Sequence, residues 1–167
     1  MPLQAAICLR YATCDAYGHK AVTQDELLRL IDQAAAENWT TLDLAGKELS
    51  ELPPEIGKLT NLKTLMRGRW DKKKGRLGNN LRTLPDEIGR LTELRSLFLA
   101  YNKFEEMPEV VGELRKLRSL ELRVNQLTRF PETIRTLKDL RFLSLGGNKL
   151  SMLPNALERL NVLKFLN

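Results

Sequence analysis

The sequence predicts a solenoid of the α/β class, a right-handed β-α superhelix in which short parallel strands line a concave face. Three observations lead to this prediction: a 23-residue repeat that starts at Trp39, an apolar composition dominated by leucine, and an amphipathic segment before the first repeat. With 167 residues, of which 43% are apolar, the chain can bury one core. We therefore expect a single domain that is stabilised by contacts between neighbouring repeats.

The repeat follows the pattern L-x-x-L-x-L-x-x-N-x-L-x-x-L-P-x-x-I-x-x-L-x-x. Its registers start at Trp39, Leu62, Leu94, Leu117, Leu140 and Leu163. The L-x-L alternation sends leucines to one face of a short strand, and stacked coils bury them in a continuous core that no single strand could form. Residues 39–167 are therefore expected to form five full repeats and the first strand of a sixth.

Asparagine and proline recur at fixed positions of the repeat. A buried amide after each strand can donate to and accept from the backbone of adjacent coils. The prolines fix φ where the chain turns to the outer face, and the I-x-x-L spacing after them predicts a short helix or a 3-10 turn. Both sets are interpreted as structural: Asn79, Asn102, Asn125 and Asn148, with Pro53, Pro85, Pro108, Pro131 and Pro154.

These motifs resemble the leucine-rich-repeat family, in particular its intracellular subclass with an L-P-x-x-I-x-x-L second half. The resemblance covers Trp39 to the C-terminus. The stretch VTQDELLRLIDQAAAE followed by LDLAGKELSELPPEIGKL is also similar to the segment that begins bacterial Roco-type proteins, which continue into a Ras-like GTPase. The 167 residues contain no GTPase motif, so the resemblance implies at most a recognition segment of such an enzyme.

The two ends of the chain depart from the repeat. Thr23-Gln-Asp-Glu26 forms a capping box and an apolar helical stripe follows it, so residues 23–38 are expected to be a helix that covers the first coil. Residues 1–22 match neither element and are a tail of unknown role. The unfinished sixth strand would leave a sheet edge through which two copies could associate.

The second repeat contains about nine extra residues between its strand and Asn79. Arg67 stands where the other repeats have a core leucine, and because an unpaired buried guanidinium is costly, we expect it to reach solvent. The segment 67–76 holds six basic residues and one aspartate, so the net charge of +6 is interpreted as coming mainly from this loop. It is either a solvated insertion or a basic surface for nucleic acid or another anionic surface. The residues of that basic surface would be Arg69, Trp70, Lys72, Lys73, Lys74 and Arg76.

The outward strand positions predict the binding surface, because most of them are small or polar while a few are apolar. Exposed apolar clusters of this kind mark interaction surfaces, although cross-strand aromatic pairs that only stabilise the sheet are the alternative. The sequence therefore favours a module that binds a protein partner on the concave face. The candidate contacts are Met66, Phe98, Tyr101, Glu121, Arg123, Phe142, Ser144 and Phe165.

Catalysis and cofactor binding are not indicated. The only histidine is His19, in the tail, and with Cys8 and Cys14 it matches no standard metal-site spacing. We expect no enzyme activity, no cofactor and no metal. The first residues lack a signal-peptide pattern, no apolar run is long enough to span a membrane, and the two cysteines form no disulfide framework, which favours a cytoplasmic setting.

Overall fold

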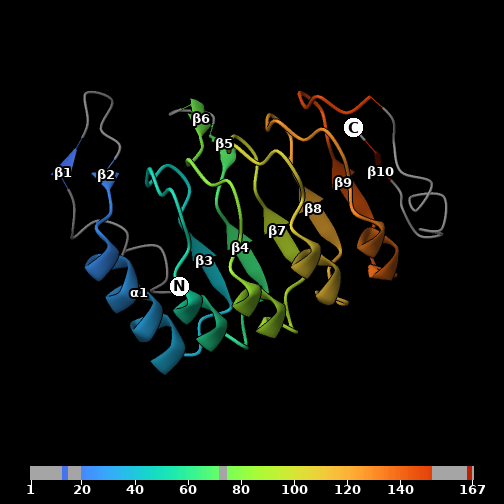
Figure 1. The fold of residues 1–167 in the computed structure, drawn as a ribbon. Coiled ribbons are helices and arrows are strands. Elements are labelled where there is room, and N and C mark those ends of the chain that lie inside the picture. The colour runs from blue at the N-terminus through green and yellow to red at the C-terminus, as the bar shows by residue number, and fades with distance from the viewer. Residues whose placement is uncertain (1–12, 15–19, 72–74, 152–164, 167) are drawn as a thin grey trace.

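The computed structural model describes residues 13–14, 20–71, 75–151 and 165–166. A helix, α1 (Gln24–Ala36), precedes a stack of coils, and each coil contributes one short strand to a parallel sheet (Figure 1). The sheet has six strands in the order β10-β9-β8-β7-β4-β3. Their bounds are β3 (Thr41–Asp43), β4 (Thr64–Met66), β7 (Ser96–Phe98), β8 (Ser119–Glu121), β9 (Phe142–Ser144) and β10 (Phe165–Leu166). The predicted solenoid with a parallel sheet is confirmed.

The core consists of the leucines that the repeat places on the inner face of each strand. The middle residue of β3, β4, β7, β8 and β9 is at most 2% exposed, while the residues on either side of it face outward in most of these strands. This pattern follows from the alternation of side chains along a strand. The inner column of strand residues is Leu42, Leu65, Leu97, Leu120 and Leu143.

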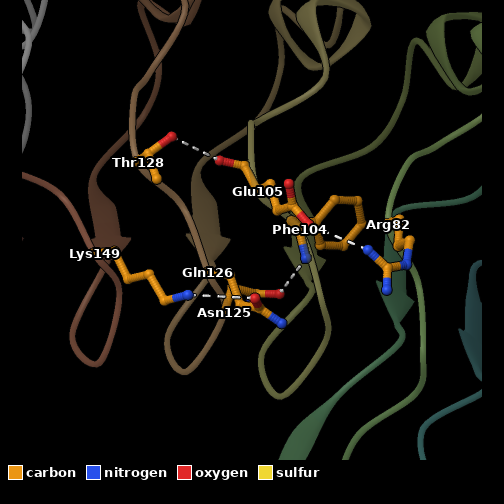
Figure 2. Close-up of polar contacts among 7 residues, drawn as sticks. All are labelled: Arg82, Phe104, Glu105, Asn125, Gln126, Thr128 and Lys149. Atoms are coloured by element: carbon orange, nitrogen blue, oxygen red, sulfur yellow. Dashed lines mark hydrogen bonds and ion pairs between the residues drawn. The ribbon is translucent and has the colours of Figure 1, made fainter.

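The predicted asparagine ladder is present after the strands. Asn125 accepts a hydrogen bond from the Phe104 N–H at 3.2 Å and donates to the carbonyls of Leu99 and Leu122, both at 2.9 Å. Figure 2 shows the contact between Asn125 and Phe104. Each amide thus joins its own coil to the preceding one, which satisfies backbone groups that would otherwise be buried without partners.

The outer side of the coils is formed by short 3-10 helices, each of which begins after a proline. These prolines lie at φ between −60° and −74°, the range that their ring fixes. The I-x-x-L spacing predicted either short helices or 3-10 turns, and the outer elements are 3-10 helices. They span Pro54–Lys58, Asp86–Arg90, Glu109–Glu113 and Glu132–Thr136.

The N-terminal helix covers the first coil as the sequence predicts. The Thr23 side chain accepts the Glu26 N–H, and the Glu26 carboxylate accepts the Thr23 N–H at 2.9 Å, which completes the capping box. Leu27 and Ile31 of α1 are fully buried in the shared core, and Trp39 packs against it. Before the helix, β1 (Thr13–Cys14) pairs with β2 (Lys20–Ala21) in an antiparallel two-stranded sheet.

The insertion in the second coil folds back as a hairpin of β5 (Arg69–Asp71) and β6 (Gly75–Leu77). It projects beyond the end of β4 (Figure 1). Glycines on both sides of the hairpin lie against the third coil: a Cβ on Gly68 would be 1.6 Å from the Ala100 carbonyl oxygen, and one on Gly78 would be 2.0 Å from the Tyr101 carbonyl oxygen. The sequence indicated an extra loop, and the structure places its base in tight contact with the next repeat.

The expectation that Arg67 reaches solvent is wrong. Its side chain is 0% exposed, and its three guanidinium nitrogens have no hydrogen-bond partner within the described residues. Burial lowers the pKa of Arg67 to about 9, well below its ordinary value. The backbone explains the placement, because the Arg67 N–H donates to the Phe98 carbonyl at 2.7 Å and the Arg67 carbonyl accepts from Asn79 at 2.7 Å. The main chain therefore stays in the ladder and directs the side chain into the leucine position.

Candidate binding face on the concave sheet

The concave face of the sheet carries two columns of side chains that point away from the leucine core. Within each column, residues on neighbouring strands are direct partners in the register of the sheet. The first column is Thr41, Thr64, Ser96, Ser119 and Phe142, and the backbone of Phe165 is registered with Phe142. The second column is Asp43, Met66, Phe98, Glu121 and Ser144.

Apolar side chains interrupt the small and polar members of these columns. Met66 and Phe98 are neighbours in the second column, and each remains partly open to solvent. Phe142 is also partly open, in the first column beside Ser119. Phe165 is registered with Phe142, and its backbone alone lies within the described part of the chain. The sheet therefore brings together most of the apolar residues that the sequence singled out.

Ser144 differs from its prediction. It was expected to face solvent with its column, but only 4% of it is exposed. Its strand is buried at two consecutive positions, Leu143 and Ser144, whereas β4, β7 and β8 are buried only at their middle residue. Ser144 can therefore serve as a contact only if its surroundings move.

A charged group occupies the centre of the concave face. Glu121 lies between Phe98 and Ser144 in the register, and burial raises the pKa of its carboxyl, an effect that the nearby Arg123 charge opposes. The Arg123 guanidinium carbon lies 5.8 Å from the centre of the Tyr101 ring, within the range of a cation–π contact. Tyr101 and Arg123, both candidate contacts, therefore lie next to each other.

The backbone beside this centre adopts an unusual conformation. Tyr101 has φ +56° and Val124 has φ +52°, a left-handed region that branched side chains rarely adopt. The equivalent positions of the first and fifth coils are Gly46 and Gly147, with φ +68° and +73°. The turn after the strand requires this conformation, and in the third and fourth coils it is reached without glycine.

The family comparison agrees with the repeat geometry. A family model described as a leucine-rich repeat region matches residues 82–167. The chain belongs to the leucine-rich-repeat family. Comparison with curated proteins gave no match.

Two solved leucine-rich-repeat structures resemble this one. A leucine-rich-repeat protein of Leptospira interrogans is 26% identical over 81% of this chain and 45% of its own, with a TM-score of 0.56. An internalin C2 of Listeria monocytogenes is 22% identical over 80% of this chain and 54% of its own, with a TM-score of 0.63. The chain therefore spans about half the length of the solved proteins it matches, and the second likeness concerns the fold alone.

The basic insertion of this leucine-rich-repeat protein is only partly described. Trp70 and Arg76 are direct partners in the backbone register of the hairpin. Arg69 is registered with Leu77. Lys72, Lys73 and Lys74 lie outside the described residues, as do Cys8 and His19 of the tail. No helix among the described residues is long and apolar enough to cross a membrane.

Ion pairs between equivalent positions of successive repeats were missed by the sequence reasoning. Arg82 pairs with Glu105 at 3.1 Å and Lys116 pairs with Glu93 at 2.5 Å, each across a 23-residue step. The Glu105 carbonyl also accepts from Thr128, and Figure 2 shows this contact beside the pair with Arg82. Opposite charges one repeat apart were the available signal, because the period places such residues on adjacent coils.

Proposed function

We propose that this leucine-rich-repeat chain is a non-catalytic module that binds a protein partner on its concave face. Leucine-rich-repeat domains generally act in protein interaction. The observation that carries the proposal is the group of partly open apolar side chains, Met66, Phe98 and Phe142, on a face that otherwise holds small and polar residues. Apolar anchors surrounded by polar residues supply most of the binding energy in protein interfaces.

The charged centre gives such an interface specificity. A partner that covers Glu121 must supply a hydrogen-bond donor or a positive charge, because an unpaired carboxylate loses its solvent when it is covered. Arg123 and Tyr101 offer a second contact next to it, with the guanidinium held over the ring. These groups decide which partner is accepted, while the apolar residues supply the affinity.

Affinity capture with wild-type and variant bait tests the proposed face. The triple variant Phe98→Ala, Arg123→Ala and Phe142→Ala is expected to recover the wild-type partner at least about tenfold less well, because it removes two anchors and one charge. The matched control combines Phe130→Ala with Arg135→Ala, a partly buried phenylalanine and an exposed arginine outside both columns. Equal loss with the control, or unchanged capture with the triple variant, excludes the concave face as the binding surface.

A second candidate is binding of nucleic acid or an anionic surface by the hairpin. Its support is the run of basic residues in 67–76 and the backbone register of the hairpin, in which Trp70 and Arg76 are direct partners. Such binding falls steeply with salt, and it should be abolished by Lys72→Glu, Lys73→Glu and Lys74→Glu. Binding that is weak and insensitive to salt removes this candidate.

The wider setting of the module is also a proposal. We infer a cytoplasmic bacterial protein of the intracellular repeat subclass, and locating the tagged protein in fractionated cells tests this. The similarity of residues 22–37 and 42–59 to the start of Roco-type proteins supports a recognition segment of a larger GTPase. Edge-to-edge pairing of two copies through β10, the outermost strand described at that edge of the sheet, would appear in sedimentation at two concentrations.

A further inference from the structure

The charge of the described repeats is divided between the two sides of the sheet. The segments that lead into the strands hold nine lysines and arginines against three acidic residues, and we call them the basic edge: 58–63, 90–95, 113–118 and 136–141. Outside the basic loop 67–76, which leaves β4 at the same side, the segments that follow the strands hold four basic against nine acidic residues, and we call these four segments the acidic side: 47–55, 79–87, 102–110 and 125–133. The interpretation that the basic loop accounts for the charge of the chain is therefore incomplete. The remainder is close to neutral in sum but strongly polarised in space.

A column of four cations forms the centre of the basic edge. Each is exposed and stands one residue before its strand. The backbone holds them in line, because the Arg95 N–H donates to the Lys63 carbonyl at 2.8 Å, and the same bond joins each later pair at 2.8 and 2.9 Å. The column consists of Lys63, Arg95, Arg118 and Arg141.

This arrangement is unfavourable in the isolated protein. Neighbouring strands lie about 4.8 Å apart, and like charges at directly opposite positions are destabilising. None of the four cations forms an ion pair with a residue that the structure describes. Glu93 lies near them, and its pKa is lowered chiefly by its hydrogen bond with Lys116 and to a smaller extent by the charges of Arg95 and Lys63.

We propose that the basic edge binds an acidic segment of the protein partner, an inference that rests on the proposed binding role of the module. Three of the four column cations are arginines, which can hold carboxylates by two parallel hydrogen bonds. A chain of carboxylates laid across the strand starts would remove the repulsion within the column.

The surroundings favour a protein segment over nucleic acid. The four segments of the basic edge contain no aromatic residue, whereas single-stranded nucleic acid is generally held by stacking on aromatic rings.

Binding of a fluorescent poly-L-glutamate peptide, followed by anisotropy at low and high salt, tests the inference. The variant Arg95→Glu with Arg118→Glu is expected to weaken binding about tenfold or more, since it removes two attractive charges and adds two repulsive ones. The matched control is Lys103→Glu with Lys149→Glu, which makes the same charge change at exposed positions outside the basic edge. The control is expected to bind within about twofold of wild type after long-range repulsion is screened by salt.

Three outcomes overturn the inference: equal loss in both variants, loss only when Lys72, Lys73 and Lys74 are reversed, or no binding to wild type. Tighter binding of a single-stranded oligonucleotide than of poly-L-glutamate, lost in the Arg95 and Arg118 variant, would assign the edge to nucleic acid instead. All four replaced side chains are exposed, so unchanged thermal unfolding verifies that the variants fold. Failure of this test leaves capture through Phe98 and Phe142 unaffected, so the two proposals fail separately.

Discussion

At the scale of single residues, Arg67 is the side chain whose chemistry conflicts most with its environment. A charged group without hydrogen-bond partners loses its hydration on burial, and nothing in the described part of the chain replaces it. The other coils have a buried leucine at the equivalent position, namely Leu44, Leu99, Leu122 and Leu145. The second coil therefore carries a local cost that its neighbours avoid.

Replacing Arg67 with leucine is expected to stabilise the protein by about 1–4 kcal/mol in urea unfolding, because it removes the desolvated charge and restores the core residue. The matched control is Arg95→Leu on the exposed column, where the change should stay within about 0.5 kcal/mol. An Arg67→Leu variant that is no more stable than wild type would mean that the guanidinium reaches water.

The effect of Arg67→Leu on the free energy of unfolding should depend on pH. Folding lowers the pKa of Arg67 to about 9, well below the pKa of the same side chain in the unfolded chain, so the unfolded chain holds the proton more tightly between these two values. The contribution of Arg67 to stability therefore rises as the pH increases above about 9, and below 9 the full penalty is present. The advantage of Arg67→Leu over wild type is expected to be largest at neutral pH and to shrink in unfolding experiments above pH 9.

Single-residue chemistry was predicted less well than the pattern around it. The asparagine ladder and the capping box follow from residue type and spacing alone, because each has few ways to satisfy its hydrogen bonds. Arg67 was misplaced because sequence reasoning placed it by the usual preference of its side chain, whereas the backbone ladder decided its position. Ser144 was placed outward by the alternation of residues along its strand, but the structure buries it.

At the scale of elements, the hairpin inserted after β4 is the feature that the repeat does not explain. Its length was evident from the interrupted period, but its two short strands contain few residues with strand propensity. Gly75, at φ +77° after the three lysines, is the glycine typical of a hairpin turn and was the available signal. The strands and the short outer turns were predictable because a period of 23 residues repeats their pattern in every coil. The capping helix was predictable from its capping box and its apolar stripe.

The glycines at the base of the hairpin are expected to be essential for its contact with the third coil. Gly68→Ala would place a Cβ against the Ala100 carbonyl, and the shift needed to relieve that contact should cost about 1–3 kcal/mol in urea unfolding. Gly75→Asn is the control. A Cβ at Gly75 would have no neighbouring atom within 4 Å, and asparagine tolerates the positive φ of this position, so the effect on stability should be small. Equal effects at both positions would show that the base is not closely packed.

At the scale of the whole molecule, the parallel sheet places equivalent positions of successive repeats side by side on one surface. The apolar group on the concave face lies between a basic edge and an acidic side, so a partner meets different chemistry at the two ends of each strand. The sequence predicts the concave columns because a repeat position maps onto a column. It hides the charge polarity, since a sum over the chain cancels segments that the fold separates.

The central claim is that the concave face of the solenoid binds a protein. Hydroxyl-radical footprinting of the captured complex tests it most directly, because methionine and aromatic side chains react readily when they are open to solvent. The account predicts that Met66, Phe98 and Phe142 lose reactivity in the complex while Phe130, outside both columns, keeps it. Unchanged reactivity of those three residues, with protection confined to Trp70 of the hairpin or to Phe130, would contradict it.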